Sequence, residues 1–383
     1  MKFFLFKDAV LKWLETPSVY QIRKDELFEL DCDSFKFLQD SASLNGIDAQ
    51  LSPDISEFVD YCLKEEILSI NKVSVKCPPL IKSSEPSLRY LELQITNRCN
   101  LKCKHCYANL PSPPKELSLN QIRKILKEFE EMQGLRVLIS GGEPLLHRGF
   151  DEINEMLPEF SVRKVLFTNG LLLNKNILKK LNVQEIQISI DGLERAHDSL
   201  RGEGTFKSTI EAVNLSIDSG FEVSISTMVH PGNLQDFDDL QRLFRDMGIR
   251  DWSVDVPCVT GRLIENHEFQ IEPVLAGRYL KYGFGDGLHA GDRGFACGLH
   301  LMAVMANGDV SKCTFYSDRA VGRIEETLME CWRRIKPIRL HELKCDCDYI
   351  ESCRGGCRYR AELLGDPLGK DLYRCGLYDK ITP

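Results

Sequence analysis

From residue 89 onward, short runs of β-favouring residues alternate with longer segments that have the periodicity of helices. The runs are LRYLELQIT, LRVLIS, KVLFTN, EIQISI, FEVSISTMV and DWSVDV. Helical patterns such as residues 117–132, in which Ser118 is the predicted cap, separate them. Strands that alternate with helices form parallel sheets, because each helix returns the chain to the same edge. We therefore predict an α/β fold over residues 89–284, with six parallel strands in a partial (β/α)6 barrel of the TIM type.

Chemically distinctive residues follow four of these strands. Cys99 comes after the first strand, the GGEP tetrapeptide (residues 141–144) after the second, Asn169 after the third and Asp191 after the fourth. Ligand sites of parallel sheets lie at the C-terminal ends of the strands. We therefore expect these residues to meet in one site.

Two further regions flank the predicted barrel. Residues 1–76 contain β-rich runs around the polar turn RKD and then two helical patterns, which predict a small winged-helix-like α+β module. Residues 77–88 are rich in Pro and Ser and are predicted to form a linker. Residues 285–383 lose the alternation and are rich in cysteine, which predicts a separate C-terminal domain.

The chain has 15 cysteines among its 383 residues. The N-terminus lacks a signal peptide, so we expect a cytoplasmic protein, in which thiols are more often metal ligands or catalytic groups than disulfides. Cys32, Cys62, Cys77 and Cys331 stand alone and are predicted to be small buried hydrophobes. A net charge of −8 argues against a nucleic-acid partner, and no apolar stretch is long enough to span a membrane.

Cys99, Cys103 and Cys106 lie close together in the segment ITNRCNLKCKHCYANL. Three thiolates on one loop can bind three irons of a cubane and leave the fourth iron open. A structural zinc site normally takes four protein ligands, and this loop has no fourth cysteine. The spacing therefore favours an iron–sulfur cluster with one open position.

This Cx3Cx2C pattern after the first strand, with His105 before its last cysteine, resembles the radical S-adenosylmethionine (SAM) superfamily. The resemblance implies that Cys99, Cys103 and Cys106 hold a [4Fe–4S] cluster whose open iron binds SAM. It implies reductive cleavage of SAM to a 5′-deoxyadenosyl radical, which abstracts hydrogen from the substrate. It also implies a reductant such as a flavodoxin or a ferredoxin.

Other strand-end residues match the SAM-binding positions of this family. The GGEP element resembles the one that receives the methionine amino group, since glycines permit close approach and a carboxylate accepts from an ammonium. A serine and an aspartate after the fourth strand resemble residues that contact ribose and carboxylate, and a following arginine resembles the one aimed at the carboxylate. Taken alone, GGEP also fits an ordinary strand-to-helix turn. The predicted SAM-binding residues are His105, Gly141, Gly142, Glu143, Ser189, Asp191 and Arg201.

The C-terminal cysteines resemble the SPASM extension of radical SAM enzymes, which carries two auxiliary [4Fe–4S] clusters. The resemblance assigns Cys297, Cys313 and Cys357 to the first auxiliary cluster. It assigns Cys345, Cys347, Cys353 and Cys375 to the second. One or two structural zinc ions are the alternative, because thiolate quartets also suit zinc.

Three features depart from the family pattern. Cys345 and Cys347 are one residue apart where the family has CxxC, which leaves their ligation open. The first auxiliary cluster has three obvious ligands, so Cys258 or a non-cysteine group completes it, or one iron is open; we hypothesise an open or exchangeable iron. Sulfatase-maturing relatives carry an Asp that acts as a general base directly after the second C-terminal cysteine. In this chain that cysteine is Cys313, and the next residue is Thr314.

Residues 1–76 are similar in pattern to the module by which enzymes that modify ribosomally made peptides add a leader peptide as an edge strand. A winged helix also binds DNA, but the acidic residues of this segment argue against that partner. We therefore expect hydrogen abstraction from a peptide or protein, followed by a crosslink or an oxidation. The alternatives are the same chemistry on a tetrapyrrole or another cofactor precursor, and a non-catalytic iron–sulfur or zinc scaffold.

Overall fold

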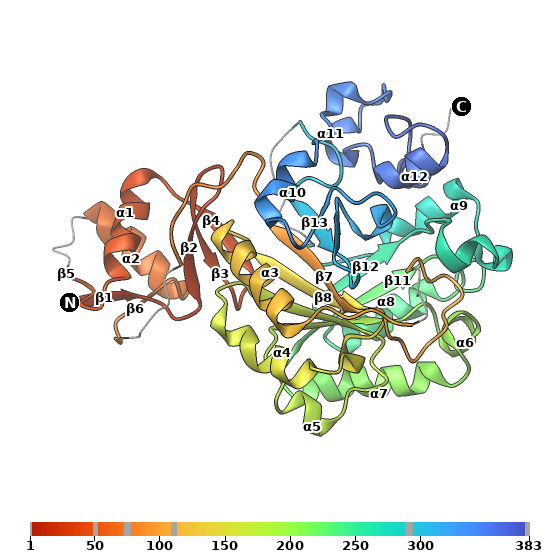
Figure 1. The fold of residues 1–383 in the computed structure, drawn as a ribbon, viewed down its shortest axis with the longest axis horizontal. Helices are drawn as coiled ribbons and strands as arrows, with labels where there is room; N and C mark the ends of the chain where they lie inside the picture. The colour runs from red at the N-terminus through yellow and green to blue at the C-terminus, as the bar shows by residue number, and fades with distance from the viewer. Residues whose placement is uncertain (1, 49–52, 73–77, 109–112, 288–293, 380–383) are drawn as a thin grey trace.

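The computed structural model describes residues 2–48, 53–72, 78–108, 113–287 and 294–379. Six parallel strands form its centre, as the alternation of elements predicted (Figure 1). Strands that follow one another in the chain are neighbours in the sheet, so their carboxyl ends lie along one edge. The strands are β7 (Tyr90–Thr96), β8 (Arg136–Gly141), β9 (Arg163–Thr168), β10 (Glu185–Ser189), β11 (Glu222–Met228) and β12 (Asp251–Asp255).

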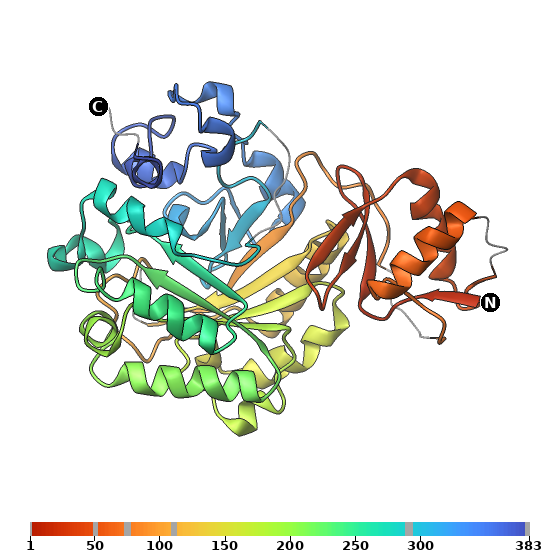
Figure 2. The ribbon, with the colours of Figure 1, turned by 180° about the vertical axis from the view of Figure 1, so that it is seen from behind.

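Helices connect these strands and pack against the sheet (Figure 2). The first begins at Ser118, whose hydroxyl accepts from the Gln121 N–H while its own N–H donates to the Gln121 side chain. Residues on one face of that helix, including Ile122 and Phe129, are buried in the main core. The connecting helices are α3 (Leu119–Glu131), α4 (Phe150–Met156), α5 (Lys175–Leu178), α6 (Glu194–Arg201), α7 (Thr205–Asp218) and α8 (Phe237–Asp246).

The C-terminal region extends the same sheet. Strand β13 (Leu301–Val304) pairs with β7 in parallel, and β14 (Asp309–Ser311) and β15 (Gly322–Arg323) continue the sheet in antiparallel fashion. The sequence analysis missed these strands because they are short and β13 pairs with a strand far away in the chain. The predicted boundary at residue 285 thus lies between regions that share one sheet, and the partial (β/α)6 barrel stays a prediction.

Short helices lie in the remaining C-terminal region, beside and above the sheet in Figure 1. The helices are α9 (Pro273–Gly277), α10 (Leu328–Arg334), α11 (Ile350–Cys353), α12 (Arg358–Leu363) and α13 (Leu372–Leu377). Of the cysteines that the sequence assigned to two auxiliary clusters, Cys353 lies in α11 and Cys375 in α13, and Cys357 immediately precedes α12.

The N-terminal module projects from one side of the molecule (Figures 1 and 2). The predicted hairpin is present as β3 and β4, and both predicted helices are present, but the module contains more strands than the sequence suggested. It has two three-stranded sheets, in the orders β5-β1-β6 and β2-β3-β4. The likeness to a winged helix stays a prediction. The elements are β1 (Lys2–Leu5), β2 (Ala9–Trp13), β3 (Pro17–Gln21), β4 (Glu26–Glu29), α1 (Cys32–Ser41), β5 (Ile47–Asp48), α2 (Pro53–Lys64) and β6 (Leu68–Ser69).

The turn between β3 and β4 inserts a buried carboxylate beneath the amino ends of the central strands. Asp25 pairs with Arg136 of β8 at 2.5 Å and lies 3.5 Å from Arg163 of β9. Arg163 also donates to the carbonyls of Ile22 and Arg23 at 2.9 Å each. The module is therefore bound to the sheet through charge-assisted hydrogen bonds that are removed from water.

A buried lysine makes a second contact between the module and the sheet region. Lys12 of β2 donates from Nζ to the Gly134 carbonyl at 2.7 Å. Burial lowers the pKa of Lys12 from 10.5 to about 7, although Glu130 opposes this shift. Lys12 and Asp25 therefore both bind the described part of the N-terminal module to the sheet region.

The isolated cysteines differ from one another. Cys62 and Cys331 are buried, as predicted, whereas Cys32 is exposed at the first residue of α1, so the prediction for Cys32 was wrong. Its position in the first turn of a surface helix explains the exposure. Cys77 lies outside the described residues. Among the described helices, none combines the length and apolarity needed to cross a bilayer.

Candidate functional site

A cavity of about 350 Å³ lies at the carboxyl ends of the parallel strands. It gathers residues that are far apart in the sequence and that the sequence analysis had assigned to one site. The predicted residues that line it are Cys99, Cys103, His105, Cys106, Gly141, Gly142, Ser189, Asp191, Arg201 and Cys258. We refer to this space as the inner cavity.

The cysteine loop forms one wall of the inner cavity. Cys103 is buried, and Cys99 and Cys106 are partly exposed. Burial raises the pKa of Cys99 to about 11. The loop is held against α6, since the Lys104 N–H donates to the Leu200 carbonyl at 2.9 Å. The structure thus presents three free thiols from one loop to one space.

The donor set fits an iron–sulfur cluster better than a single metal ion. No group of three or more Cys, His, Asp or Glu side chains in the described ranges is arranged to hold one ion. A cubane takes one thiolate per iron, so its ligands stand apart around the cluster. Nδ1 of His105, which is buried beside the loop, has no hydrogen-bond partner in the described part of the chain. His105 lines the inner cavity, and a buried nitrogen without a partner is consistent with a ligand there.

The two glycines of GGEP are required by the protein backbone itself. Gly141 has a φ of +155°, and a Cβ on it would lie 2.2 Å from the Thr96 carbonyl oxygen. A Cβ on Gly142 would lie 2.3 Å from the Arg98 carbonyl oxygen. The end of β8 therefore passes directly against the start of the cysteine loop, which only glycine permits. The glycines position the loop in addition to lining the cavity.

Glu143 is held by the protein and is not among the residues that line the inner cavity. Its carboxylate accepts from the Thr168 hydroxyl at 2.8 Å, the Asn169 N–H at 2.9 Å and the Leu145 N–H at 3.3 Å. Burial raises its pKa to about 7. This carboxylate ties the end of β8 to the end of β9, and its contact with the SAM amino group stays a prediction.

Asp191 positions Arg201 at the cavity wall. Its carboxylate accepts from Nε of Arg201 at 2.6 Å and from the Met228 N–H at 2.7 Å. Burial alone would raise the pKa of Asp191, but Arg201 holds that pKa well below its ordinary value. Nη1 of Arg201 lies 3.9 Å from Sγ of Cys103. The guanidinium is thus fixed beside the cysteine loop, where it suits an anionic ligand group.

Histidine side chains surround this ion pair and are uncharged at neutral pH. His105 Nε2 lies 3.7 Å from the Asp191 carboxylate, and His230 Nε2 lies 2.9 Å from the Asp191 carbonyl oxygen. Burial lowers the pKa of His105 to about 4. Arg201 is therefore the main positive charge at this wall.

The sequence analysis missed Glu92, a buried carboxylate of β7 that lines the inner cavity. It accepts from the hydroxyls of Ser140 at 3.0 Å, Thr314 at 3.1 Å and Tyr107 at 3.4 Å. No Lys, Arg or His of the described ranges forms an ion pair with it, and burial raises its pKa. Its only sequence signal was an acidic residue between two leucines of the first predicted strand.

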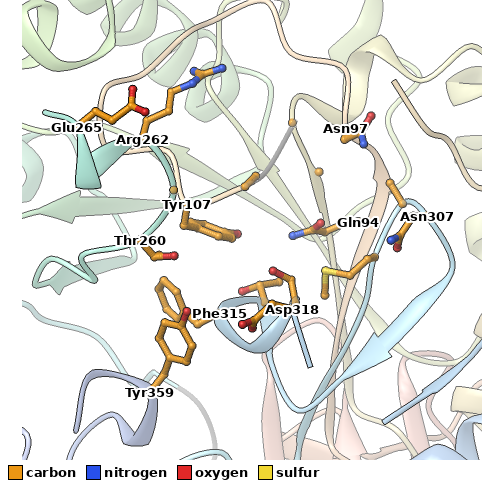
Figure 3. A pocket seen from close by; sticks show the side chains of 18 residues that line it. Gln94, Asn97, Tyr107, Thr260, Arg262, Glu265, Asn307, Phe315, Asp318 and Tyr359 are labelled. Carbon is orange, nitrogen blue, oxygen red and sulfur yellow. The ribbon is translucent and has the colours of Figure 1, made fainter. Parts of the chain in front are cut away.

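A larger outer cavity of about 730 Å³ adjoins the inner one. Tyr107, Gly141, Thr314 and Phe315 line both. The rings of Tyr107 and Phe315 have centroids 5.1 Å apart, and Phe315 stacks with Tyr359 at 5.9 Å. Figure 3 shows these rings close together. Tyr107 and Phe315 thus border both cavities, and Tyr359 borders the outer one.

The outer cavity has amide groups and few cations. Gln94, Asn97 and Asn307 supply amides, which Figure 3 shows on the side of the pocket away from Arg262. Arg262 is its one cationic side chain among the described residues, and Glu265 and Asp318 are anionic. Such a lining suits a polar ligand with many hydrogen-bonding groups and little negative charge.

The C-terminal thiols affect one another's pKa values, and their assignment to two auxiliary clusters stays a prediction. Burial raises the pKa of Cys375 to about 11, and Cys345, Cys347 and Cys353 are near enough to raise it further. Among the cysteines assigned to the first cluster, the Cys297 and Cys357 side chains are hydrogen-bonded, and Cys313 acts on the pKa of Cys297. All 14 cysteines in the described residues are free thiols.

The sequence of residues 93–244 matches the model of the radical SAM superfamily. The chain contains a radical SAM domain. Its sheet, its cysteine loop and the inner cavity all belong to this domain or border it. A [4Fe–4S] cluster and SAM binding follow from this family.

The radical SAM domain has relatives of different named activities. AdoMet-dependent heme synthase of Oleidesulfovibrio alaskensis is 26% identical over 75% of this chain and 87% of its own. Mycofactocin maturase MftC of Mycobacterium ulcerans is 28% identical over 76% of this chain and 89% of its own. Streptococcus suis SuiB, solved with its precursor peptide SuiA, has a TM-score of 0.68 at 16% identity, covering 97% of this chain and 99% of SuiB. The last likeness establishes a shared fold that includes the N-terminal module.

Proposed function

We propose that this radical SAM enzyme abstracts hydrogen from a side chain or α-carbon of a peptide or protein, which ends in a crosslink or an oxidation. The lining of the outer cavity is the observation that carries the proposal. Its amides match the hydrogen-bonding groups of a polypeptide, and its volume lies within the range of ligand sites. The likeness to the maturase MftC and to SuiB, which was solved with a precursor peptide, supports this class of substrate.

A tetrapyrrole is the second candidate substrate, because three heme synthases are among the relatives. Tetrapyrroles of that pathway carry several carboxylates, which need cations for recognition. One arginine against two carboxylates in the outer cavity disfavours such a ligand. A purely structural iron–sulfur or zinc scaffold is disfavoured by the fixed Asp191–Arg201 pair beside the cysteine loop.

In this proposal Cys99, Cys103 and Cys106 hold the cluster, and Arg201 and His105 contact SAM. When bound, the cluster and SAM together supply a 5′-deoxyadenosyl radical. The seven C-terminal cysteines hold auxiliary clusters, and a flavodoxin or ferredoxin supplies electrons. The free thiols agree with a cytoplasmic location.

The N-terminal module is proposed to recognise the peptide by strand addition. Strand β4 is the edge of its sheet, whereas β2 lies at the other edge, where the Trp13 carbonyl accepts from the Ser83 N–H at 2.8 Å. Beside β4, Phe28 packs edge-on against Tyr61 of α2, with ring centroids 6.0 Å apart. This pair offers an apolar contact next to the free backbone edge.

Glu92 is proposed as the proton acceptor. After hydrogen abstraction, oxidation of the substrate requires loss of one electron and one proton. An auxiliary iron–sulfur cluster, when bound, would supply the electron acceptor, and the Glu92 carboxylate in the inner cavity takes the proton. Thr314 occupies the position at which sulfatase-maturing relatives have the Asp that acts as a general base. Its hydroxyl donates to Glu92, so the Glu92 carboxylate of β7 lies next to that position.

The proposed function is tested by SAM cleavage in the reconstituted, dithionite-reduced protein under anaerobic conditions. One reaction contains SAM alone, the next adds synthetic peptides encoded by short reading frames adjoining the gene, and a third adds iron-coproporphyrin III. We expect 5′-deoxyadenosine in every reaction, and a peptide that has lost two hydrogens in the second. Conversion of the coproporphyrin alone would establish the tetrapyrrole alternative, and an iron-loaded protein that never forms 5′-deoxyadenosine would contradict radical chemistry.

Replacing Glu92 with Gln is expected to separate SAM cleavage from product formation. The amide keeps the shape and accepts hydrogen bonds but cannot take a proton, so product should fall by roughly 100-fold or more. Formation of 5′-deoxyadenosine should stay within about twofold of wild type. Adding Thr314→Asp to Glu92→Gln should restore product, and unchanged product in Glu92→Gln alone would exclude this role.

A further inference from the structure

Arg262, the one cationic side chain among the described residues that line the outer cavity, has no carboxylate partner in the described ranges. Its half-buried side chain donates from Nη1 to the Cys103 carbonyl at 3.4 Å. A guanidinium has five N–H donors, so this long contact leaves most of them without an acceptor in the described part of the chain. The unused donors are available to a ligand in the outer cavity.

The two carboxylates that line the outer cavity do not neutralise Arg262. Figure 3 shows Asp318 across the pocket from Arg262, and the Asp318 carboxylate lies 3.8 Å from Nε of Arg319. Glu265 lies on the same side of the pocket as Arg262, but it is exposed and no ion pair joins the two. An exposed carboxylate is a weak partner because water competes with it. A carboxylate that a ligand brings into the cavity therefore meets an unpaired guanidinium.

The backbone of Arg262 is fixed against the cysteine loop. Its N–H donates to the Cys106 carbonyl at 3.0 Å. The preceding Gly261 has a φ of +56°, and a Cβ on it would lie 2.4 Å from the same carbonyl oxygen, so only glycine permits this approach. Nδ2 of Asn266 donates to the Arg262 carbonyl at 2.7 Å and to the Lys104 carbonyl at 3.2 Å. Arg262 thus has a fixed place between the outer cavity and the loop that borders the inner one.

Apolar packing holds the same segment in place. Arg262 lies in the short helical turn η3 (Gly261–Ile264), next to Leu263. Leu263 is fully buried and packs with Leu200 of α6 and with Phe269 in a cluster separate from the main core. A charged group that is positioned before its ligand arrives loses less conformational entropy on binding. The packing therefore favours Arg262 as a binding group.

We propose that Arg262 binds one carboxylate of the peptide substrate in the outer cavity and thereby sets which residue of the peptide faces the inner cavity. The inference rests on the proposed function, since it takes a peptide as the substrate. A planar guanidinium binds a carboxylate through two parallel hydrogen bonds, which fix position as well as affinity. The carboxylate belongs to an Asp or Glu side chain or to the C-terminus of the peptide, and the test separates these sources.

The test measures binding of the synthetic peptides that short reading frames adjoining the gene encode. Each peptide carries a fluorophore, and fluorescence anisotropy gives its Kd for the reconstituted protein with SAM but without reductant, so that no turnover occurs. Further versions replace each Asp with Asn, replace each Glu with Gln, or carry an amidated C-terminus. We expect one of these changes to weaken binding roughly 10-fold or more and the others to act within about twofold.

Variants of Arg262 identify the partner of that carboxylate. Arg262→Gln should weaken binding of the unmodified peptide by the same factor, and the two changes together should cause no further loss, since they remove one contact. Arg262→Lys keeps the charge without the planar fork, so its Kd should lie between those of the wild type and Arg262→Gln. Arg242→Gln removes an exposed arginine that pairs with Asp239 on α8, and this matched control should leave Kd within about twofold.

Charge reversal guards against a variant that simply misfolds. Where the carboxylate is a side chain, Arg262→Glu should bind a peptide with Lys at that position more tightly than the wild-type protein does. Equal Kd values of the wild type and Arg262→Gln for the unmodified peptide would overturn the proposal. Unchanged binding of every carboxylate-free version to the wild type would do the same.

A selection covers the case in which no adjoining peptide binds the wild type. A random-sequence peptide library displayed on mRNA is selected in parallel against the wild type and Arg262→Gln. Enrichment of an acidic residue by the wild type alone would support the proposal, and equal acidic content in both selections would overturn it.

These outcomes are separable from those of the SAM assay. A peptide that binds through Arg262 but is never converted would refute the proposed reaction and keep the carboxylate site. A peptide that the wild type and Arg262→Gln convert with the same KM would refute only the role of Arg262.

Discussion

Replacing Cys99, Cys103 and Cys106 together with alanine is expected to abolish formation of 5′-deoxyadenosine. The three thiols are the only cysteines on the loop that forms one wall of the inner cavity, and Cys103 lies 3.9 Å from Arg201. Without them the cavity keeps its arginine but has no ligands for the cluster that reduces SAM. The loss should be at least about 1,000-fold, since the uncatalysed reaction supplies no comparable route. Mass spectrometry of reduced, anaerobic reactions measures it directly.

Cys62→Ala is the matched control for this triple variant. Cys62 is buried in the N-terminal module, away from both cavities, so its removal should leave 5′-deoxyadenosine formation within about twofold. The triple variant should also contain about four fewer irons per chain than the control. A triple variant that cleaves SAM at the wild-type rate would mean that the radical centre lies elsewhere in the molecule.

Replacing Asp25 is expected to lower the free energy of unfolding more than any other single substitution in the N-terminal module. Asp25 faces Arg136 and Arg163, both buried, and its φ of +62° is left-handed. Removing one partner of a buried ion pair leaves an uncompensated charge and typically costs about 3–5 kcal/mol. Asp25→Asn isolates this electrostatic part, because Asn tolerates the same backbone conformation. Asp25→Ala adds backbone strain and should be less stable still.

Urea unfolding of the apo-protein measures both variants. Asp40→Asn removes an exposed carboxylate that pairs with Lys36 on α1, and it should change the free energy of unfolding by less than about 0.5 kcal/mol. Hydrogen exchange should rise first in β3 and β4 of the Asp25 variants. Equal stability of Asp25→Asn and Asp40→Asn would show that the arginines find other partners.

The Asp25 contacts also decide how the N-terminal module should be tested. Deleting residues 1–76 would remove Lys12 and the partners of Arg136 and Arg163 as well as any peptide-binding surface. Lost activity would then report lost stability as readily as lost recognition. Substitutions at Phe28 or Tyr61, beside the free edge of β4, leave those buried contacts in place.

Much of the fold follows from local patterns. The six parallel strands, the Ser118 cap and the hairpin around residue 25 each depend on residues close together in the chain. Hydrophobic periodicity and capping involve residues a few positions apart in the chain, so both can be recognised in the sequence. The placement of chemically distinctive residues after successive strands predicted the inner cavity for the same reason.

Other features depend on contacts between distant segments. Strand β13 joins the sheet beside β7, and the Thr314 hydroxyl meets Glu92 across 222 residues of sequence. Glu143 was assigned to SAM, yet its carboxylate accepts from the Thr168 hydroxyl and from the backbone N–H groups of Leu145 and Asn169. These contacts form because tertiary packing brings distant segments together, and no local sequence pattern predicts which segments meet.

The sequence by itself determined the alternation of strands and helices, the radical SAM cysteine loop and the strand ends that surround it. Only the tertiary structure decided that Asp25 binds the N-terminal module to the sheet, that Glu92 lines the inner cavity, and that Cys258 lines the same cavity. The physical reason is that periodicity is set by neighbours along the chain. The partner of a buried charge or thiol is set by whichever distant segment the fold brings against it.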